Sequence, residues 1–344
     1  RDRTFTGDYF IRNTEGMLAD SYELPGVFGA KTPDENCADL RTNGWELYLG
    51  WNDSFALMGK RFNYTVSATL GDNKTVFTKF NNPEKNLSNH YEGKVLGEIW
   101  GYRVDGLFAS DEEAAEYTSK INQDAVNERI LTDKVDPYYR AGDLKFRDLD
   151  GDNVISKGDD TAYDAGDREI IGNETPRYMY SFRLGADWNG FDLGIFFQGV
   201  GKRDWYPNYL STGFWGPYSR AFTSFIPENF MDQCWSEENR DGYFPRFRGY
   251  QTFAGSQLGV NNDRYLQDAS YIRLKNLTVG YTLPVLKKVF TKLRVYFTGE
   301  NLWYWSPMLK HTKYIDPEAA GGNGNTGMAY NYSRNFSVGV DITF

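Results

Sequence analysis

The chain lacks any long apolar run. None of its 344 residues lies in a stretch of about 18 consecutive apolar residues, and its mean hydropathy is -0.62. A membrane-spanning helix needs about 20 such residues in a row, so helical spans are excluded. Membrane-spanning β-strands escape this test, because they are short and only every second side chain faces lipid. The low hydropathy therefore leaves the membrane β-barrel open.

Cysteine and histidine are also scarce. Cys37 and Cys234 are the only cysteines and cannot build a disulfide framework, so one bridge and two thiols are both open. His90 and His311 are the only histidines, and their spacing suits neither a zinc site nor a nucleophile and its base. Paired carboxylates are numerous, but no pair stands out as a glycosidase site. We therefore expect that the chain is not an enzyme.

An excess of positive charge is missing as well. The 38 basic and 47 acidic residues give a formal net charge of -9. This balance disfavours a nucleic-acid partner, because phosphate binding needs clustered Lys and Arg. The chain begins on Arg1, Asp2 and Arg3 with no charged and apolar leader. It is therefore either processed or a piece of something longer.

In place of apolar runs the sequence has alternation. The large apolar residues Phe336, Val338, Val340, Ile342 and Phe344 alternate with small or polar ones, which puts them on one face of a strand. Aromatic residues make up 17% of the chain, and 35 residues are Gly. This composition fits many strands with aromatic girdles and tight turns. It also fits a secreted sugar-binding sandwich.

Period-two alternation predicts eight strands. They cover residues 4–13, 43–52, 62–70, 182–188, 191–197, 271–283, 293–297 and 336–344. Asn189-Gly190 is typical of a two-residue type I′ hairpin turn, and Asn52-Asp53 predicts another short connection. In the sixth strand Ile272 and Leu274 are out of phase with the later apolar residues, which predicts a β-bulge near Asn276.

The connections between these strands alternate strictly between short and long. The long ones cover residues 14–41, 71–177, 199–269 and 304–331. Outer-membrane barrels show this alternation, with tight periplasmic turns and extended extracellular loops. The same rule places the C-terminus in the periplasm. Aromatic residues near the strand ends suit the lipid headgroup region; they are Trp45, Trp188, Trp303, Tyr304 and Trp305.

One long loop contains a calcium-type motif. Its side-chain oxygen ligands fall at positions 1, 3, 5, 9 and 12 of a twelve-residue loop, with a backbone carbonyl at position 7. The residues are Asp148, Asp150, Asp152, Ser156 and Asp159, with the Val154 carbonyl. Asn153 replaces the usual turn glycine and Asp159 the usual Glu, while Ile155 anchors the loop to apolar neighbours. The site predicts a structural Ca²⁺ ion; the alternative is a solvated acidic turn without an ion.

Five segments resemble the SusC/RagA group of TonB-dependent transporters and occur in the group's order. They are 142–152 (GDLKFRDLDGD), 171–178 (IGN and then PRY), 190–201 (GFDLGIFFQGVG), 271–281 (YIRLKNLTVGY) and 299–302 (GENL). The resemblance covers most of the chain. It implies an all-β fold, a transmembrane antiparallel β-barrel with long extracellular loops. This chain would supply about the last eight strands of a 22-stranded barrel, while the plug domain and the segment that contacts TonB have no counterpart in it.

The resemblance also implies a function. Members of the group import glycans or peptides across the bacterial outer membrane, with energy from TonB and with a SusD-like lipoprotein as a lid over the extracellular mouth. The competing hypothesis is a secreted, calcium-stabilised, all-β carbohydrate-binding protein. It explains the acidity, the aromatics and the calcium motif, but neither the alternating loop lengths nor the terminal aromatic residue.

The aromatic-rich loop 199–269 holds the candidate contacts with substrate or lid. They are Arg203, Trp205, Tyr206, Tyr209, Trp215 and Tyr218. Flat rings beside hydrogen-bonding groups suit sugars and peptides, and they equally suit packing in the core of the loop itself. In the other long loop, residues 111–129 predict a short solvated helix.

Overall fold

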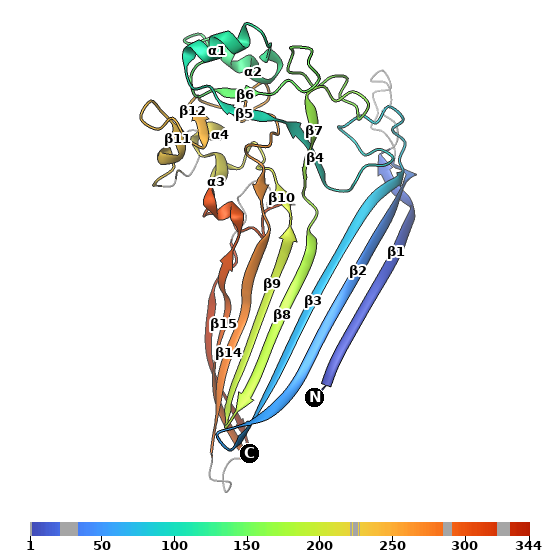
Figure 1. Cartoon of the computed structure of the whole chain (residues 1–344), viewed down its shortest axis with the longest axis vertical. Coiled ribbons are helices and arrows are strands. Elements are labelled where there is room, and N and C mark those ends of the chain that lie inside the picture. Colours follow the sequence, from blue (N-terminus) through green and yellow to red (C-terminus); the bar gives the residue numbers. More distant parts are fainter. Residues whose placement is uncertain are drawn as a thin grey trace.

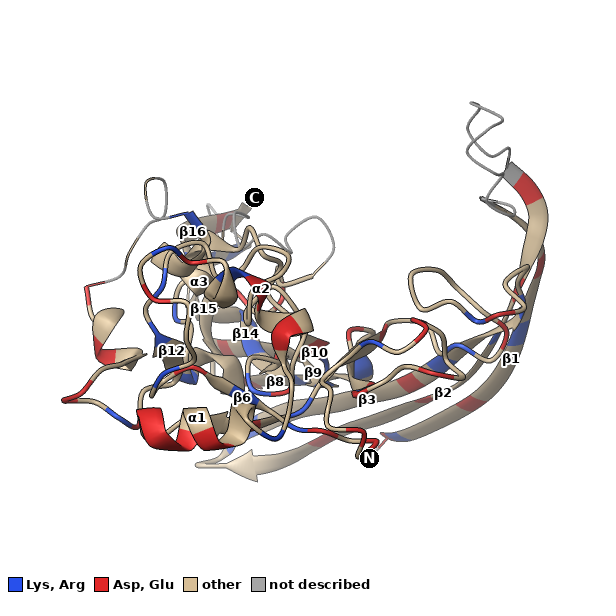
Figure 2. Ribbon diagram, turned by 90° about the horizontal axis from the view of Figure 1, so that it is seen from above, with Lys and Arg blue, Asp and Glu red and all other residues tan. Residues whose placement is uncertain are grey.

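Eight strands form one antiparallel sheet in the computed structural model of the protein, which describes residues 2–20, 34–220, 222, 226, 228–284, 291–321 and 331–344. In order across the sheet they are β1 (Asp2–Asp20), β2 (Asp34–Leu57), β3 (Lys60–Lys79), β8 (Arg177–Trp188), β9 (Phe191–Lys202), β14 (Tyr271–Leu283), β15 (Lys292–Trp305) and β16 (Asn335–Thr343). β1 and β16 are the two edges, and Figure 2 shows the sheet as an open, curved wall. All eight predicted strands are confirmed.

The strand ends differ from the predicted ones in the first half of the wall. β2 does not turn at Asn52-Asp53 but continues to Leu57, and the chain reverses at Met58 and Gly59, which have φ of 51° and 73°. Positive φ at both residues is what a type I′ hairpin requires, and Asn52 and Asp53 instead pair along β3. β1 and β2 also run past their predicted ends and pair as far as Asp20 and Asp34, so Trp45 lies inside β2 and not at its end.

Two other local predictions are confirmed. Asn189 and Gly190 both have positive φ, 48° and 89°, and join β8 to β9 as a two-residue turn. The register of β14 shifts between Leu274 and Asn276 against both of its neighbours, which is the predicted bulge. The extra residue restores the phase, so that Ile272 and Leu274 share a face with the apolar residues that follow.

The wall has one apolar and one polar face. The register aligns one apolar row across seven strands: Val340, Val295, Tyr281, Phe191, Trp188, Phe62 and Phe55. Such side chains stand on the surface of the wall, as Val338 and Val340 show with exposures of 77% and 54%. The next position along each strand points to the opposite face and is mainly polar or glycine. Among the described residues, the main hydrophobic core therefore lies outside the sheet, to which a smaller cluster with Ala38 and Phe77 belongs.

The long connections carry many short elements. They are β4 (Glu98–Tyr102), β5 (Val104–Leu107), α1 (Asp111–Thr118), α2 (Asp124–Leu131), β6 (Leu144–Phe146), β7 (Arg168–Asn173), β10 (Asp204–Trp205), α3 (Thr212–Trp215), α4 (Pro217–Arg220), a 3₁₀ turn (Met231–Gln233), β11 (Cys234–Trp235), β12 (Phe244–Arg246), β13 (Gln267–Asp268) and a second 3₁₀ turn (Pro307–Lys310). Figure 1 shows them gathered at the end of the sheet opposite the C-terminus. We call the described residues of 80–176, 203–270 and 306–321 the loop lobe. Across the described chain, every helix is too short and too polar to span a membrane.

The loop lobe contains the main hydrophobic core. Leu144 and Ile155 come from the first of its segments, Trp215 and Phe244 from the second, and Met308 from the third, and all are buried in one cluster. Each such side chain stabilises the folded state by about 1.5–3 kcal/mol through its burial. The three loops, far apart in sequence, therefore fold as one body at one end of the wall.

Candidate functional site

The polar face of the wall is held together by ion pairs between strands. Arg294 on β15 donates from Nε and Nη2 to both carboxylate oxygens of Asp192 on β9, at 2.8 and 2.7 Å, and from Nη1 to Asp341 on β16 at 3.0 Å. The arginine crosses β14 at Gly280, where an added Cβ would lie 2.5 Å from Asp192 and 2.6 Å from Arg294. A glycine is therefore required at this crossing, where one arginine joins carboxylates on β9 and β16.

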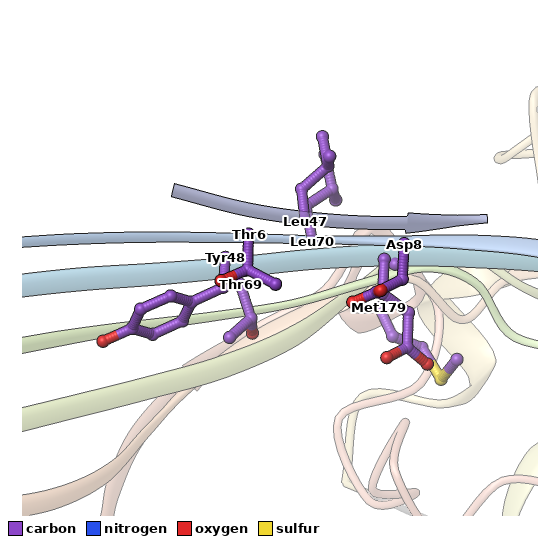
Figure 3. Close-up of a pocket in the computed structure, with 9 residues that line it drawn as sticks. Thr6, Asp8, Leu47, Tyr48, Thr69, Leu70 and Met179 are labelled. Carbon is purple, nitrogen blue, oxygen red and sulfur yellow. The ribbon is translucent and has the colours of Figure 1, made fainter. Parts of the chain in front are cut away.

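A hollow of about 290 Å³ lies against β1, β2, β3 and β8. Figure 3 shows Tyr48, Thr69 and Met179 on one side of the sheet, while Leu47 and Leu70 point to the other. On the polar side, Asp8 lies directly opposite Glu46 in the pairing of β1 with β2. Hydroxyl groups and carboxylates thus line this part of the wall, and they suit a hydrogen-bonding ligand that passes along it.

Three of the predicted contact residues lie in the core of the loop lobe. Trp205, Trp215 and Tyr218 are buried, and Trp215 is 0% exposed. The Trp215 Nε1 donates to the backbone carbonyl of Asn208 at 3.1 Å, and the Tyr218 hydroxyl donates to that of Pro245 at 2.6 Å. Burial raises the pKa of Tyr218. These contacts favour the packing alternative for the three residues.

Tyr206 and Tyr209 lie together at a second hollow, of about 270 Å³, between β4 and the segment after β10. Tyr209 is 46% exposed, and the Tyr206 hydroxyl donates to the carbonyl of Val260 at 2.9 Å. Glu174 and Asn261 line the same hollow. Rings, an amide and a carboxylate are thus close together on an accessible surface, which suits a sugar or a peptide.

Arg203, the sixth predicted contact residue, ties separate segments together. Its Nε donates to the carbonyl of Glu174 at 3.2 Å and its Nη1 to that of Pro317 at 3.4 Å. Burial lowers the pKa of its guanidinium. Its donors are directed at the backbone of the first and third segments of the loop lobe, so it ties the three segments of the lobe to one another.

The acidic loop brings together a set of carboxylates that differs from the twelve-residue pattern. Oxygens of Asp148, Asp150 and Asp167 all lie within 4.8 Å of one another, whereas Asp152 and Asp159 lie outside this group. Asp167 is fully buried, and its two oxygens accept from the backbone N–H groups of Leu149 and Ser156 at 2.7 and 2.8 Å. Burial raises the pKa of Asp167, and the charges of Asp150 and Asp148 raise it further.

Asp167 comes 19 positions after Asp148, so no short ligand spacing could have identified it. Two of the remaining predicted positions have local partners: Asp152 accepts from the N–H of Val154 at 2.7 Å, and the Ser156 hydroxyl accepts from that of Gly158 at 3.1 Å. Asn153 has the left-handed φ of 67° that replaces the glycine turn, and Ile155 is buried in the lobe core as predicted.

The two cysteines lie in different parts of the molecule. Cys37 is in β2. Cys234 is in the lobe core, where its thiol contacts the carbonyl of Phe230 at 3.6 Å, and burial raises its pKa. The structure does not bridge these two residues to each other.

A buried ion cluster, which the sequence did not predict, joins the loop lobe to the wall. Arg273 of β14 pairs with Asp316, and both side chains are 1% exposed. Arg273 Nε also lies 3.0 Å from Glu318, whose two oxygens accept from Lys275 at 2.8 Å each. Arg273 stacks on the ring of Tyr304, 4.7 Å from its centroid. The cluster fixes the segment before Gly321 against the polar face of β14.

Comparison with known proteins gives relatives of one kind. The chain is 27% identical over 366 aligned residues to TonB-dependent receptor P3 of Formosa agariphila, and 25% identical over 361 to receptor P26 of the same organism. Each match covers 98% of this chain and 32% of the relative. No family model matches the chain.

Solved structures give the same result for the fold. The chain is similar to the structure of the RagAB peptide transporter, with a TM-score of 0.64 and 21% identity, over 99% of this chain and 33% of that one. The RagAB peptide importer in its closed-closed state matches with a TM-score of 0.62 and 20% identity. The chain thus spans about a third of the length of the proteins it matches. These are receptors and transporters, in agreement with the expectation that the chain is not an enzyme.

The sheet order, the apolar outer row and the sequence matches agree with the resemblance drawn from the five segments. The chain is a homologue of the TonB-dependent receptors, and its fold is that of about one third of a RagA-type barrel chain.

Proposed function

We propose that the chain forms the C-terminal part of the barrel wall, with its extracellular loop lobe, in a receptor that imports glycans or peptides across the bacterial outer membrane. TonB supplies the energy through a part of the receptor outside this chain, and a SusD-like lipoprotein closes over the lobe. The apolar row across seven strands carries the proposal. An exposed apolar surface of this extent needs hydrocarbon against it, because water would make it a site of aggregation.

The loop lengths support the orientation. The β2–β3 and β8–β9 turns lie at the end of the wall that also holds the C-terminus, opposite the loop lobe (Figure 1). Short turns are periplasmic in outer-membrane barrels, so the lobe is extracellular. Trp188 and Trp305 end β8 and β15, where their rings suit the headgroup regions.

The lobe and the polar face support the substrate class. The hollow with Tyr206 and Tyr209 and the hollow on the polar face both present hydrogen-bonding groups. Peptides and glycans both match this chemistry. The similarity to a structure described as a peptide transporter favours peptides.

Lipid-phase labelling tests the membrane placement. In the full-length receptor in liposomes, single cysteines at Val338, Val340 and Leu193 should react with a membrane-restricted reagent. Cysteines at the neighbouring positions Ser337 and Gly194 should react with a water-soluble one, because they lie on the polar face. The reverse pattern would contradict a lipid-facing apolar side.

Uptake tests the transport itself. Cells that carry the receptor should accumulate a labelled oligopeptide or oligosaccharide only when TonB is present. Uptake without TonB, or no uptake of any candidate substrate, would contradict energised import.

The alternative of a secreted carbohydrate-binding protein requires a chain that is monodisperse without detergent. The match of 98% of the chain to TonB-dependent receptors favours the receptor.

We further propose that the acidic loop holds a structural Ca²⁺ ion and stiffens the first long loop. Three carboxylates lie at close range, and one of them is buried. The backbone N–H groups that donate to the buried one carry only partial positive charge, so they do not neutralise the group, whereas a Ca²⁺ ion would. Calcium should stabilise the receptor against heat by about 2–3 kcal/mol at a concentration near a hundred times its Kd. Asp148→Asn and Asp167→Asn should abolish this gain in a thermal unfolding assay in detergent.

Asp159→Asn is the matched control. Asp159 belongs to the twelve-residue pattern but lies outside the observed group of carboxylates. Calcium should therefore still stabilise the Asp159→Asn receptor against heat. Loss of the calcium response in Asp159→Asn, with retention in Asp167→Asn, would return the site to the twelve-residue pattern.

The pH dependence of stability gives a further prediction. Since the pKa of Asp167 is raised in the folded state, the folded protein binds a proton at this carboxylate more tightly than the unfolded protein does. Without calcium, stability should therefore fall as the pH rises through that pKa.

A further inference from the structure

A cavity of about 260 Å³ opens in the loop lobe, apart from the wall and from the hollow that Tyr206 and Tyr209 line. One side is formed by the end of α2 and the turn that follows it, through Ile130 and Val135. The other side is formed by the turn after β12, through Phe247, Gln251 and Ser256. In Figure 1 α2 lies in the part of the lobe most distant from the C-terminal end of the sheet.

The charged groups at this cavity already have partners in the protein. Arg248 pairs with Asp143 at 2.9 Å and lies 3.6 Å from Asp136. Arg129 donates from Nε to the carbonyl of Ala254 at 3.2 Å. Asp133 accepts from the N–H groups of the turn, at 2.7 Å from Val135. Since each of these charged groups already has a partner in the protein, the cavity does not select an ion.

Two polar side chains that line the cavity have an atom without a partner. Gln251 is 3% exposed and Ser256 2% exposed, and neither Gln251 Nε2 nor Ser256 Oγ has a hydrogen-bond partner among the described residues. The Gln251 amide is fixed in orientation, because its Oε1 accepts from the N–H of Arg248 at 3.1 Å. Its neighbour Gln257 is satisfied at both ends, by Leu144 and Asp143. Buried donors without acceptors are uncommon and costly, so this pair requires an explanation.

We propose that this cavity is a binding subsite for a neutral ligand that offers a carbonyl or hydroxyl oxygen beside an apolar surface. Gln251 and Ser256 both line the cavity, and each supplies a donor without a partner for such an oxygen. The apolar part packs on Ile130, Phe247 and Val135, of which Val135 is 92% exposed at the mouth. A peptide backbone with an apolar side chain and a sugar ring both have this chemistry. The ligand class rests on the proposed import function, whereas the cavity and its unpartnered donors do not.

Calorimetric titration of the full-length receptor in detergent tests the proposal. The probes are a capped Ala-Phe-Ala tripeptide and maltotriose, each up to millimolar concentration. Ser256→Ala should weaken binding roughly three- to tenfold, as expected for one lost hydrogen bond. Val135→Glu should weaken it at least as much. The fold tolerates this change, because the side chain is almost fully exposed.

Ser306→Ala is the matched control. Ser306 is equally buried and its hydroxyl also has no partner among the described residues, but it does not line this cavity. Its variant should bind like the wild type. Ser256→Ala should keep or raise the thermal midpoint of the ligand-free receptor, because it removes a buried group without a partner, so its weaker binding is not a folding defect.

The outcomes separate the two proposals. Binding of the tripeptide, of maltotriose or of both, reduced by Ser256→Ala and Val135→Glu but not by Ser306→Ala, supports the subsite and identifies the source of the oxygen. No binding of either probe, or equal affinity in all variants, overturns it. TonB-dependent uptake by cells that carry the Ser256→Ala receptor shows separately whether import stands, because the cavity lies apart from the wall.

Discussion

Asp316→Ala should lower the free energy of unfolding of the receptor by about 3–5 kcal/mol, because it leaves the Arg273 guanidinium charged and buried without its main partner. Both side chains are 1% exposed, so water cannot replace the lost carboxylate. Glu318 lies 3.0 Å from Arg273 Nε but is shared with Lys275, and it compensates only in part. Denaturant titration of the receptor in detergent, followed by tryptophan fluorescence, measures the change.

The double variant Arg273→Met with Asp316→Leu is the control for this prediction. It removes both charges and keeps apolar volume, and such replacements of buried pairs are often neutral or stabilising. It should therefore be more stable than Asp316→Ala alone, while Lys275 keeps its partner Glu318. If Asp316→Ala loses less than about 1 kcal/mol, the pair is not buried in the way the structure shows.

The ion cluster also shows where prediction from sequence ends. Alternation identifies β14 and even its bulge, because an apolar face on one side of the sheet and a polar face on the other impose a period of two on each strand. Nothing local marks Arg273 as buried, since Asp316 is 43 residues away in a loop without period. Contacts between a strand and a distant loop are set by the tertiary fold alone.

The same limit applies to the candidate sites. Asn153 and Ile155 were predicted correctly because turn conformation and apolar anchoring are local properties. Asp167 was missed because it reaches the carboxylate group only after the chain folds back. Among the aromatic residues, sequence gives no means to distinguish Trp215 in the core from Tyr209 on the surface. Both follow the same pattern of rings beside polar groups.

The second large loss of stability is expected for a substitution in the hydrophobic core of the loop lobe. Trp215→Ala should destabilise the loop lobe by about 3–5 kcal/mol, because it leaves a cavity of the size of an indole ring in a packed interior. Trp215 is 0% exposed, its ring packs edge-on against Phe214 and Tyr265 at 4.7 and 5.2 Å, and its Nε1 donates to the carbonyls of Pro207 and Asn208. The buried residues of this core all lie in the loop lobe and none lies in the eight strands of the wall, so the loss should be local to the lobe.

Limited proteolysis and heat-modified mobility on gels separate the two parts. The Trp215→Ala receptor should be cut more rapidly within residues 203–270, while its barrel keeps the compact mobility of the folded form. Trp303→Ala is the matched control, since Trp303 is a tryptophan at the end of β15 with 48% of its side chain exposed, and it should leave the rate of cutting in the lobe unchanged. If Trp215→Ala instead unfolds the barrel together with the lobe, then the loops and the wall form a single cooperative unit. The buried Arg273–Asp316 pair, which joins the lobe to β14, is then the contact that couples the stability of the two parts.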